Sequence, residues 1–252
     1  MSLTATDIHV AFGGVQALDG ASVHVEPGEV TGLIGPNGAG KSTLVNCLTG
    51  FVAIDRGTVW IDGIAAEGSS AHRRARRGIA RTFQTPRIDP DASVADNIAM
   101  ARHRLNRTRL PGSVLRTPRC RREERGDVTA VHEAAERFGL TDVLQRRGSE
   151  IPVWQLRLVE VARATLLEPR YVMLDEPAAG LGGAELELLG SSIRGLAAHG
   201  LGVLLIEHNF AFVRQHADTV TVLDRGRLLA TGTPQAIAGN RAVVDSYLGA
   251  TA

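Results

Sequence analysis

The sequence is poor in residues that build disulfide frameworks and metal clusters. Its two cysteines, Cys47 and Cys120, are far apart and form no CxxC motif. A disulfide scaffold and a zinc site are therefore not expected, and a reducing cytosol is the default compartment. No apolar run approaches the roughly 20 residues of a membrane-spanning helix, and MSLTATDIHVAF lacks the pattern of a signal peptide. Any connection to a membrane is expected to run through a partner.

The sequence also has a small net charge and a single lysine. A formal net charge of +1 gives no reason to expect nucleic acid or an anionic membrane as the main partner. Lys41 is the only lysine, and arginine is concentrated in residues 72–87 and 102–125. Residues 102–125 hold no aromatic residue that could stack on a base. We interpret this stretch as a solvated loop or mobile insertion, with contact to membrane partners or lipid headgroups as the alternative.

The order of apolar and polar segments predicts one α/β domain. The first third has strand-like alternation, the middle from about Ser93 to Leu166 has helical spacing, and two short apolar strands follow at 170–177 and 200–208. Such apolar strands are typical of a parallel sheet covered on both faces. We predict a single domain, 1–252. The core and β subdomain comprise 1–85 and 167–252. The inserted helical subdomain comprises 86–166, including 102–125.

A phosphate-binding loop is indicated by GPNGAGKST, residues 35–43, between a predicted strand and a predicted helix. The segment matches GxxxxGK[ST] in its required context. Glycines allow backbone amides to approach a phosphate, and the helix directs its positive end at the anion. The Lys41 ammonium would reach the β- and γ-phosphates, and the Ser42 hydroxyl would ligate Mg²⁺. The predicted nucleotide-binding residues are Gly35, Pro36, Asn37, Gly38, Ala39, Gly40, Lys41, Ser42 and Thr43.

Two adjacent acids follow the apolar strand in YVMLDEP, residues 171–177. Asp175 is placed to hold Mg²⁺ through water, and Glu176 to orient or deprotonate an attacking water. Acids at a strand end can also be solvated turn residues, but here they accompany a phosphate loop. The pair favours hydrolysis over transfer to a bound acceptor.

The order of GPNGAGKST, RTFQ, LDEP and LIEH resembles that of ATP-binding-cassette (ABC) ATPases over essentially the whole chain. The resemblance implies a P-loop NTPase with a RecA-like core, an N-terminal antiparallel β subdomain and an inserted helical subdomain. It implies that Gln84 ligates Mg²⁺ and senses the γ-phosphate, that His208 is a switch histidine beside that phosphate, and that Phe12 stacks on adenine. Without the resemblance, Phe12 would equally be a core residue and His208 an ordinary strand-end histidine.

Longer segments are similar to the ATP-binding subunits of branched-chain amino-acid importers, namely GPNGAGKSTLVNCLTGF, GIARTFQTPRI, LDEPAAGL and LLIEHN. Urea or short-chain amide importers of the same type are the alternative. The resemblance implies an ATPase that uses ATP and Mg²⁺ at the cytoplasmic face of the cell membrane. It also implies a second ABC ATPase subunit, two membrane permease subunits and a separate substrate-binding protein, with no nucleic acid. The cargo is inferred from the resemblance alone.

One motif departs from the family. IPVWQ stands where a signature such as LSGGQ is expected, at the start of a predicted helix whose first turn suits Pro152. Pro152 has neither a hydroxyl nor an N–H, and Trp154 replaces a glycine. Gly182 also falls where the family usually has Asp or Asn. The degenerate signature comprises Ile151, Pro152, Val153, Trp154 and Gln155.

These departures suggest an asymmetric heterodimer. The chain's own half-site is complete, whereas the half-site that it lends to a neighbour is poor, so that the opposite site would turn over slowly. Two alternatives are that Trp154 merely packs and both sites work, and that the chain is a nucleotide-gated binding module with little turnover.

Overall fold

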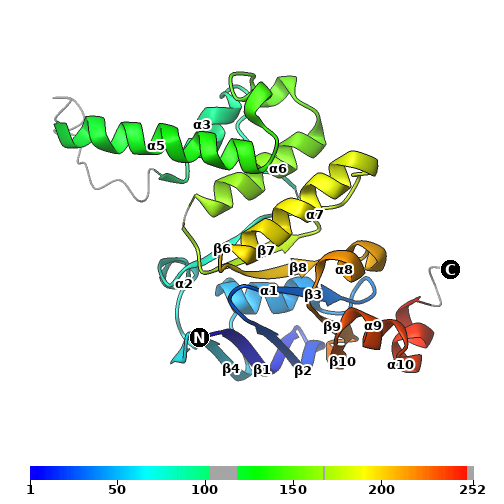
Figure 1. Cartoon of the computed structure of the whole chain (residues 1–252). Coiled ribbons are helices and arrows are strands. Elements are labelled where there is room, and N and C mark those ends of the chain that lie inside the picture. The colour runs from blue at the N-terminus through cyan, green and yellow to red at the C-terminus, as the bar shows by residue number, and fades with distance from the viewer. Residues whose placement is uncertain (84, 103–117, 167, 249–252) are drawn as a thin grey trace.

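The computed structural model describes residues 1–83, 85–102, 118–166 and 168–248. Its centre is a six-stranded sheet with strand order β10-β9-β3-β8-β7-β6 (Figure 1). All neighbouring strands pair in parallel except the edge pair β10 and β9. The strands are β3 (Val30–Ile34), β6 (Ile79–Arg81), β7 (Tyr171–Asp175), β8 (Gly202–Ile206), β9 (Thr219–Asp224) and β10 (Arg227–Gly232). The predicted parallel sheet of buried apolar strands is confirmed.

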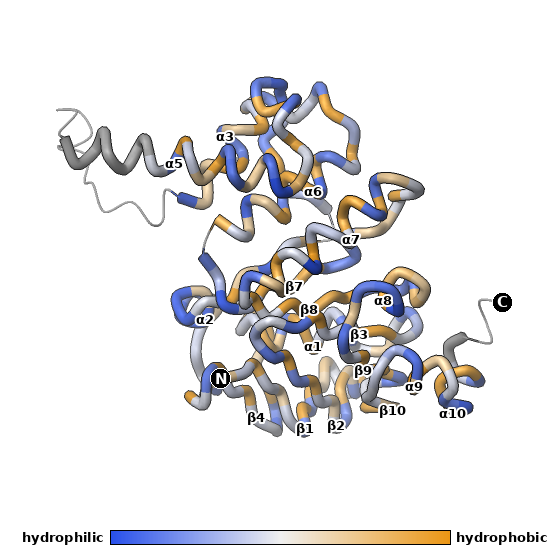
Figure 2. The backbone as a smooth tube through the Cα atoms, viewed as in Figure 1, coloured by the Kyte–Doolittle hydropathy of each residue, from blue (hydrophilic) through white to orange (hydrophobic). Residues whose placement is uncertain are grey.

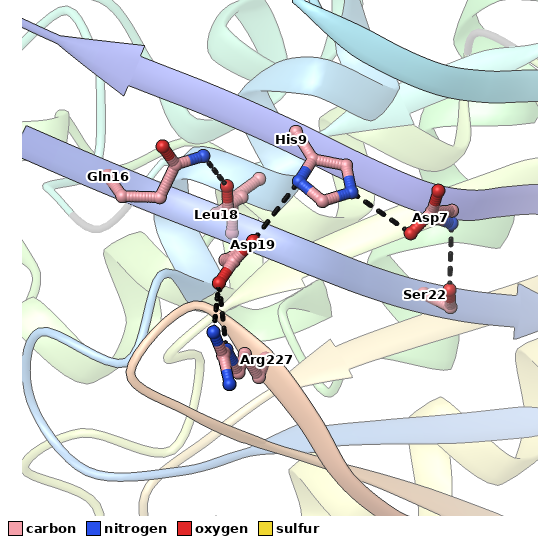
Figure 3. Close-up of polar contacts among 7 residues, drawn as sticks. All are labelled: Asp7, His9, Gln16, Leu18, Asp19, Ser22 and Arg227. Carbon is pink, nitrogen blue, oxygen red and sulfur yellow. Dashed lines mark hydrogen bonds and ion pairs between the residues drawn. The ribbon is translucent and has the colours of Figure 1, made fainter.

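A second, antiparallel sheet has the order β2-β1-β4-β5. Its strands are β1 (Leu3–Phe12), β2 (Val15–Val25), β4 (Arg56–Ile61) and β5 (Ile64–Ala65). Arg227 of β10 bonds to Asp19 of β2 with Nε–Oδ2 2.8 Å, and His9 of β1 reaches Asp19 at 3.2 Å (Figure 3). The Arg227 guanidinium, assisted by His9, holds the pKa of Asp19 below its ordinary value. The Arg227–Asp19 contact joins the two sheets, and the His9–Asp19 contact lies within the antiparallel sheet.

Helices cover both faces of the main sheet. α1 (Lys41–Thr49) lies between the two sheets, and α7 (Gly183–Ala198) and α8 (Phe210–His216) lie on the opposite face (Figure 1). Short helices complete the periphery, namely α2 (Ala71–Arg76), α9 (Pro234–Ala238), α10 (Arg241–Val243) and a π-helical turn (Val244–Leu248).

A helical lobe is inserted between β6 and β7. It contains α3 (Val94–Ala99), α5 (Pro118–Arg137), α6 (Val153–Thr165) and two 3₁₀ turns (Thr141–Val143 and Gly148–Glu150). The loop predicted for 102–125 is wrong for residues 118–125, which belong to α5. A proline tolerated in the first turn and several good helix formers explain the earlier start. Residues 103–117 lie outside the described part of the chain.

The main sheet separates two apolar clusters. On β7, Tyr171 and Met173 face one cluster, and Val172 and Leu174 face the other, because strand side chains alternate between faces. Hydrophobic residues follow the central strands along the backbone (Figure 2). The second cluster is continuous with the helical lobe, since Phe138 and Leu158 belong to it. Within the described ranges no helix is both long and apolar enough to cross a membrane.

Candidate functional site

The segment 35–40 forms the turn between β3 and α1 that the sequence predicts. Gly35 and Gly40 adopt φ values of +149° and +98°. A Cβ on Gly35 would lie 2.1 Å from the Leu223 carbonyl oxygen, and one on Gly40 would lie 2.7 Å from the Leu18 side chain. Both positions therefore require glycine. Gly40 is the N-cap of α1 and makes no side-chain hydrogen bond, so the cap residue itself leaves the amides of the first turn available.

Lys41 points its ammonium into this turn. Nζ donates to the Gly35 oxygen at 2.6 Å and to the Pro36 oxygen at 3.1 Å, and the residue is buried. Burial lowers the pKa of Lys41 below its ordinary value, and the carboxylates of Glu176 and Asp175 oppose that shift. Two predicted acids and the predicted lysine thus act on one another. Ser42 follows in the first turn of α1 with its residue exposed.

Asp175 ends β7 and is buried beside the phosphate loop. Its Oδ2 accepts from Nη2 of Arg81 at 2.9 Å, and Nη1 of Arg81 donates to Oδ1 of Asn46 on α1 at 2.5 Å. The Asp175 amide donates to Oγ1 of Thr82 at 3.1 Å. Sequence reasoning missed Arg81. Its place within RTFQ, three residues before Gln84, is the signal that could have found it.

Glu176 holds an unusual backbone conformation, with φ +49°. Its amide donates to the Ile206 oxygen at 2.9 Å, and its carbonyl accepts from Nη1 of Arg157 on α6 at 2.9 Å. Its Oε1 lies 3.9 Å from Nδ1 of His208, whose side chain is 55% exposed. The structure therefore brings the predicted base and the predicted switch histidine together.

Glu207 is a fully buried acid next to His208 that the sequence reasoning missed. Its Oε1 accepts from the Ala178 amide at 2.8 Å, and its Oε2 from the His208 amide at 3.3 Å. Burial raises the pKa of the Glu207 carboxyl. The carboxyl thus ties the segment after Glu176 to the segment that carries His208. A charged residue at the end of a wholly apolar strand was the available signal.

The remaining predicted residues divide into three groups. Phe12 ends β1 and is 51% exposed, so the alternative that it is a core residue is wrong. Gln84 lies outside the described residues. In the degenerate signature, Pro152 caps α6, which begins one residue later than its sequence suggests. Val153 is exposed, and Trp154 is half-buried against the core cluster.

The turn fits a bound triphosphate. Glycines that no larger residue could replace, the amides at the start of α1, which the cap residue Gly40 leaves without a side-chain bond, and a buried ammonium are the groups that bind phosphate. Asp175 and the Ser42 hydroxyl are oxygen donors of the kind that Mg²⁺ prefers. Among the described residues no group of three His, Cys, Asp or Glu side chains could hold a metal unaided.

The ABC transporter family model matches residues 18–179. The high-affinity branched-chain amino acid transport ATP-binding protein BraF of Pseudomonas aeruginosa is 38% identical, over 98% of this chain and 97% of that protein. The corresponding protein LivG of Escherichia coli is 37% identical over the same shares. A solved ATP-binding cassette of an ABC transporter in its ADP conformation has a TM-score of 0.84, with 31% identity and 99% of each chain covered. The chain therefore belongs to the ABC transporter family, as a nucleotide-binding cassette that couples ATP hydrolysis to transport.

Proposed function

We propose that this cassette energises the uptake of branched-chain amino acids. The observation that supports the site is the meeting of Lys41, Asp175 and Glu176 at one phosphate-binding turn. The cargo is supported by the two relatives named for branched-chain amino acid transport, which match nearly the whole chain. Uptake of urea or short amides by the same type of importer is the competing outcome.

In the proposed reaction each residue has a defined task. The Lys41 ammonium leaves the Gly35 and Pro36 oxygens and donates to the phosphates. Ser42 and Asp175 would hold Mg²⁺, which would supply positive charge to neutralise the developing negative charge. The Glu176 carboxylate accepts a proton from the attacking water, and His208 donates a hydrogen bond on the γ-phosphate side. Phe12, exposed at the end of β1, stacks on adenine.

The proposed assembly contains a second, different cassette, two membrane permease subunits and a separate substrate-binding protein, and it places the chain at the cytoplasmic face of the membrane. The heterodimer is suggested by IPVWQ, in which Pro152 supplies no hydroxyl and no N–H to a neighbour's nucleotide. The packing of Trp154 against the core supports a structural role for that side chain. The two alternatives are a second site that turns over slowly and a Trp154 that only packs. They predict different numbers of nucleotides retained per complex.

The test of function uses the assembled transporter in vesicles, with ATP hydrolysis measured as each cargo is added. We expect leucine, isoleucine or valine, presented by the binding protein, to stimulate hydrolysis, and urea to leave it unchanged. Glu176→Gln should lower turnover by at least about 10²-fold, as loss of a general base does. Glu133→Gln, an exposed position on α5, is the matched control. Stimulation by urea alone would refute the proposed cargo.

The asymmetry is tested separately with Trp154→Gly in the same assembly. If the signature limits one site, this substitution changes the number of nucleotides retained per complex and the steady-state rate. Unchanged rate and occupancy, in a variant shown to be folded by its melting temperature, would show that both sites work and that Trp154 only packs.

A further inference from the structure

Three side chains on one face of α6 bond to the two loops that flank the site. Arg157, Glu160 and Arg163 are spaced by three residues, which places them near one another on a helix surface. Arg157 donates to the Glu176 oxygen at 2.9 Å. Glu160 Oε1 accepts from the Phe83 amide at 3.3 Å, and Arg163 Nη1 donates to the Arg87 oxygen at 2.7 Å. One helix therefore contacts the segments on both sides of the site.

The contact with Glu176 secures a strained residue. A non-glycine residue in the left-handed region persists only when its surroundings over-determine it. Here both backbone polar groups of Glu176 are fixed, the amide by Ile206 and the carbonyl by Arg157. The carbonyl also accepts from the Ala179 amide, but at the longer distance of 3.3 Å. Loss of the Arg157 donor therefore removes the shorter of these two bonds to the carbonyl, and relaxation of φ and ψ would turn the carboxylate away from its present direction. Arg157 itself is not placed to touch the reacting atoms through this bond.

The contacts of α6 with Phe83 and Arg87 likewise fix backbone groups. Glu160 is buried, and its Oε1 also lies 3.6 Å from Nη2 of Arg163. The Arg87 guanidinium lies over the Phe83 ring, 4.3 Å from its centroid. A buried carboxylate bonded to a backbone amide costs free energy when its partner is lost. The backbone on either side of position 84 is thereby held against α6.

We propose that Arg157 and Glu160 are positioning residues, through which α6 fixes the Glu176 peptide and the Phe83 amide for ATP hydrolysis. The inference rests on the proposed role of Glu176 as the base. It makes α6, whose first turn carries IPVWQ, an element that sets the rate at the chain's own nucleotide site. A displacement of α6 would therefore change the orientation of the Glu176 carboxylate without moving the phosphate turn.

The experiment measures kcat, KM and nucleotide affinity in the assembled transporter for Arg157→Ala, Arg157→Lys and Glu160→Gln. Arg157→Ala should lower kcat about tenfold, the value of one hydrogen bond with a charged partner. Its affinity for ATP should change by less than about threefold, because the phosphate turn is untouched. Arg157→Lys should recover most of the rate, since an ammonium can donate to the same carbonyl. Glu160→Gln, which loses the charge that faces the Phe83 amide, should lower kcat in the same direction.

Arg214→Ala, at an exposed arginine on α8, is the matched control and should match wild type. Wild-type kcat in Arg157→Ala would overturn the proposal, as would an equal fall in kcat and affinity. If Arg157→Ala does not fold, failure of the folded Arg157→Lys variant to exceed one tenth of the wild-type rate overturns it instead. Glu176→Gln run in parallel separates the two ideas, because full turnover in that variant refutes the base and not the positioning contact.

Discussion

Arg81 and Asp175 form a buried ion pair beside the phosphate-binding turn, with 2.9 Å between Nη2 and Oδ2 and side chains that are 12% and 10% exposed. The same guanidinium reaches Asn46, so it joins α1 to the ends of β6 and β7. Arg81 therefore orients the acid that is expected to serve the metal. The free energy of unfolding of the protein should therefore depend on Arg81.

Arg81→Met should destabilise the protein strongly. Removing one partner leaves Asp175 buried and uncompensated, which costs about 3–5 kcal/mol in the free energy of unfolding. Arg194→Met is the control, because Arg194 and Asp218 form an exposed pair with side chains 47% and 36% exposed. Such surface pairs contribute about 1 kcal/mol or less. Urea denaturation of both variants measures the difference, and equal losses would contradict it.

Lys41→Ala should abolish tight ATP binding. The ammonium is lost from a turn in which it otherwise donates to two carbonyl oxygens. Because charge-assisted hydrogen bonds contribute about 1.5–3 kcal/mol each, losing them should raise the dissociation constant for ATP at least about tenfold. Lys41→Arg should fail to restore it, because the planar guanidinium does not fit where a compact ammonium lies 2.6 Å from the Gly35 oxygen. Calorimetric titration with MgATP measures both, and wild-type affinity in Lys41→Ala would exclude the turn as the phosphate site.

Two glycines on α7 should respond to alanine in opposite directions. A Cβ on Gly190 would lie 2.2 Å from Nε2 of His216, whereas one on Gly195 would meet nothing within 4 Å. Gly190→Ala should cost about 1–3 kcal/mol through overpacking. Gly195→Ala should gain about 0.5–1 kcal/mol from helix propensity. Thermal unfolding of the two variants distinguishes them, and a stable Gly190→Ala would mean that the ring moves aside at little cost.

His216 should make the protein less stable in mild acid. Burial lowers its pKa below 6.5, with Glu187 opposing and Arg194 assisting the shift. Among the described side chains, its Nε2 is one of two buried atoms without a hydrogen-bond partner. The unfolded chain then binds the proton more readily, so stability is fully present above pH 6.5 and is lost as the pH falls towards the folded-state pKa.

The variant His216→Asn removes that titration. We expect the free energy of unfolding of wild type to fall more between pH 7.5 and about 5.5 than that of the variant. Nuclear magnetic resonance titration of the His216 ring should give a pKa below the ordinary value. A ring that titrates at or above 6.5 would contradict the argument.

The sequence predicts the parts of the site that depend on local chain geometry. The phosphate turn and Glu176 each follow a buried strand, Asp175 ends one, and the carboxyl ends of parallel strands meet at one edge of a sheet. His208 and Phe12 required the family resemblance as well. The contacts of Arg81, Arg157 and Glu207 escaped prediction because their partners are distant in sequence and their pairing depends on packing. The early start of α5 shows that proline and arginine content alone is a poor guide to loops.

Phe138 and Leu158 of the helical lobe belong to the same apolar cluster as Val203 and Leu205 of β8. Cutting out 86–166 would expose to water the part of this cluster that the lobe covers, so the remainder should aggregate rather than survive as a minimal ATPase. Swapping this insert between relatives should succeed only when the β6 and β7 side chains that contact α6 are exchanged with it. In calorimetry the chain should accordingly melt in a single peak.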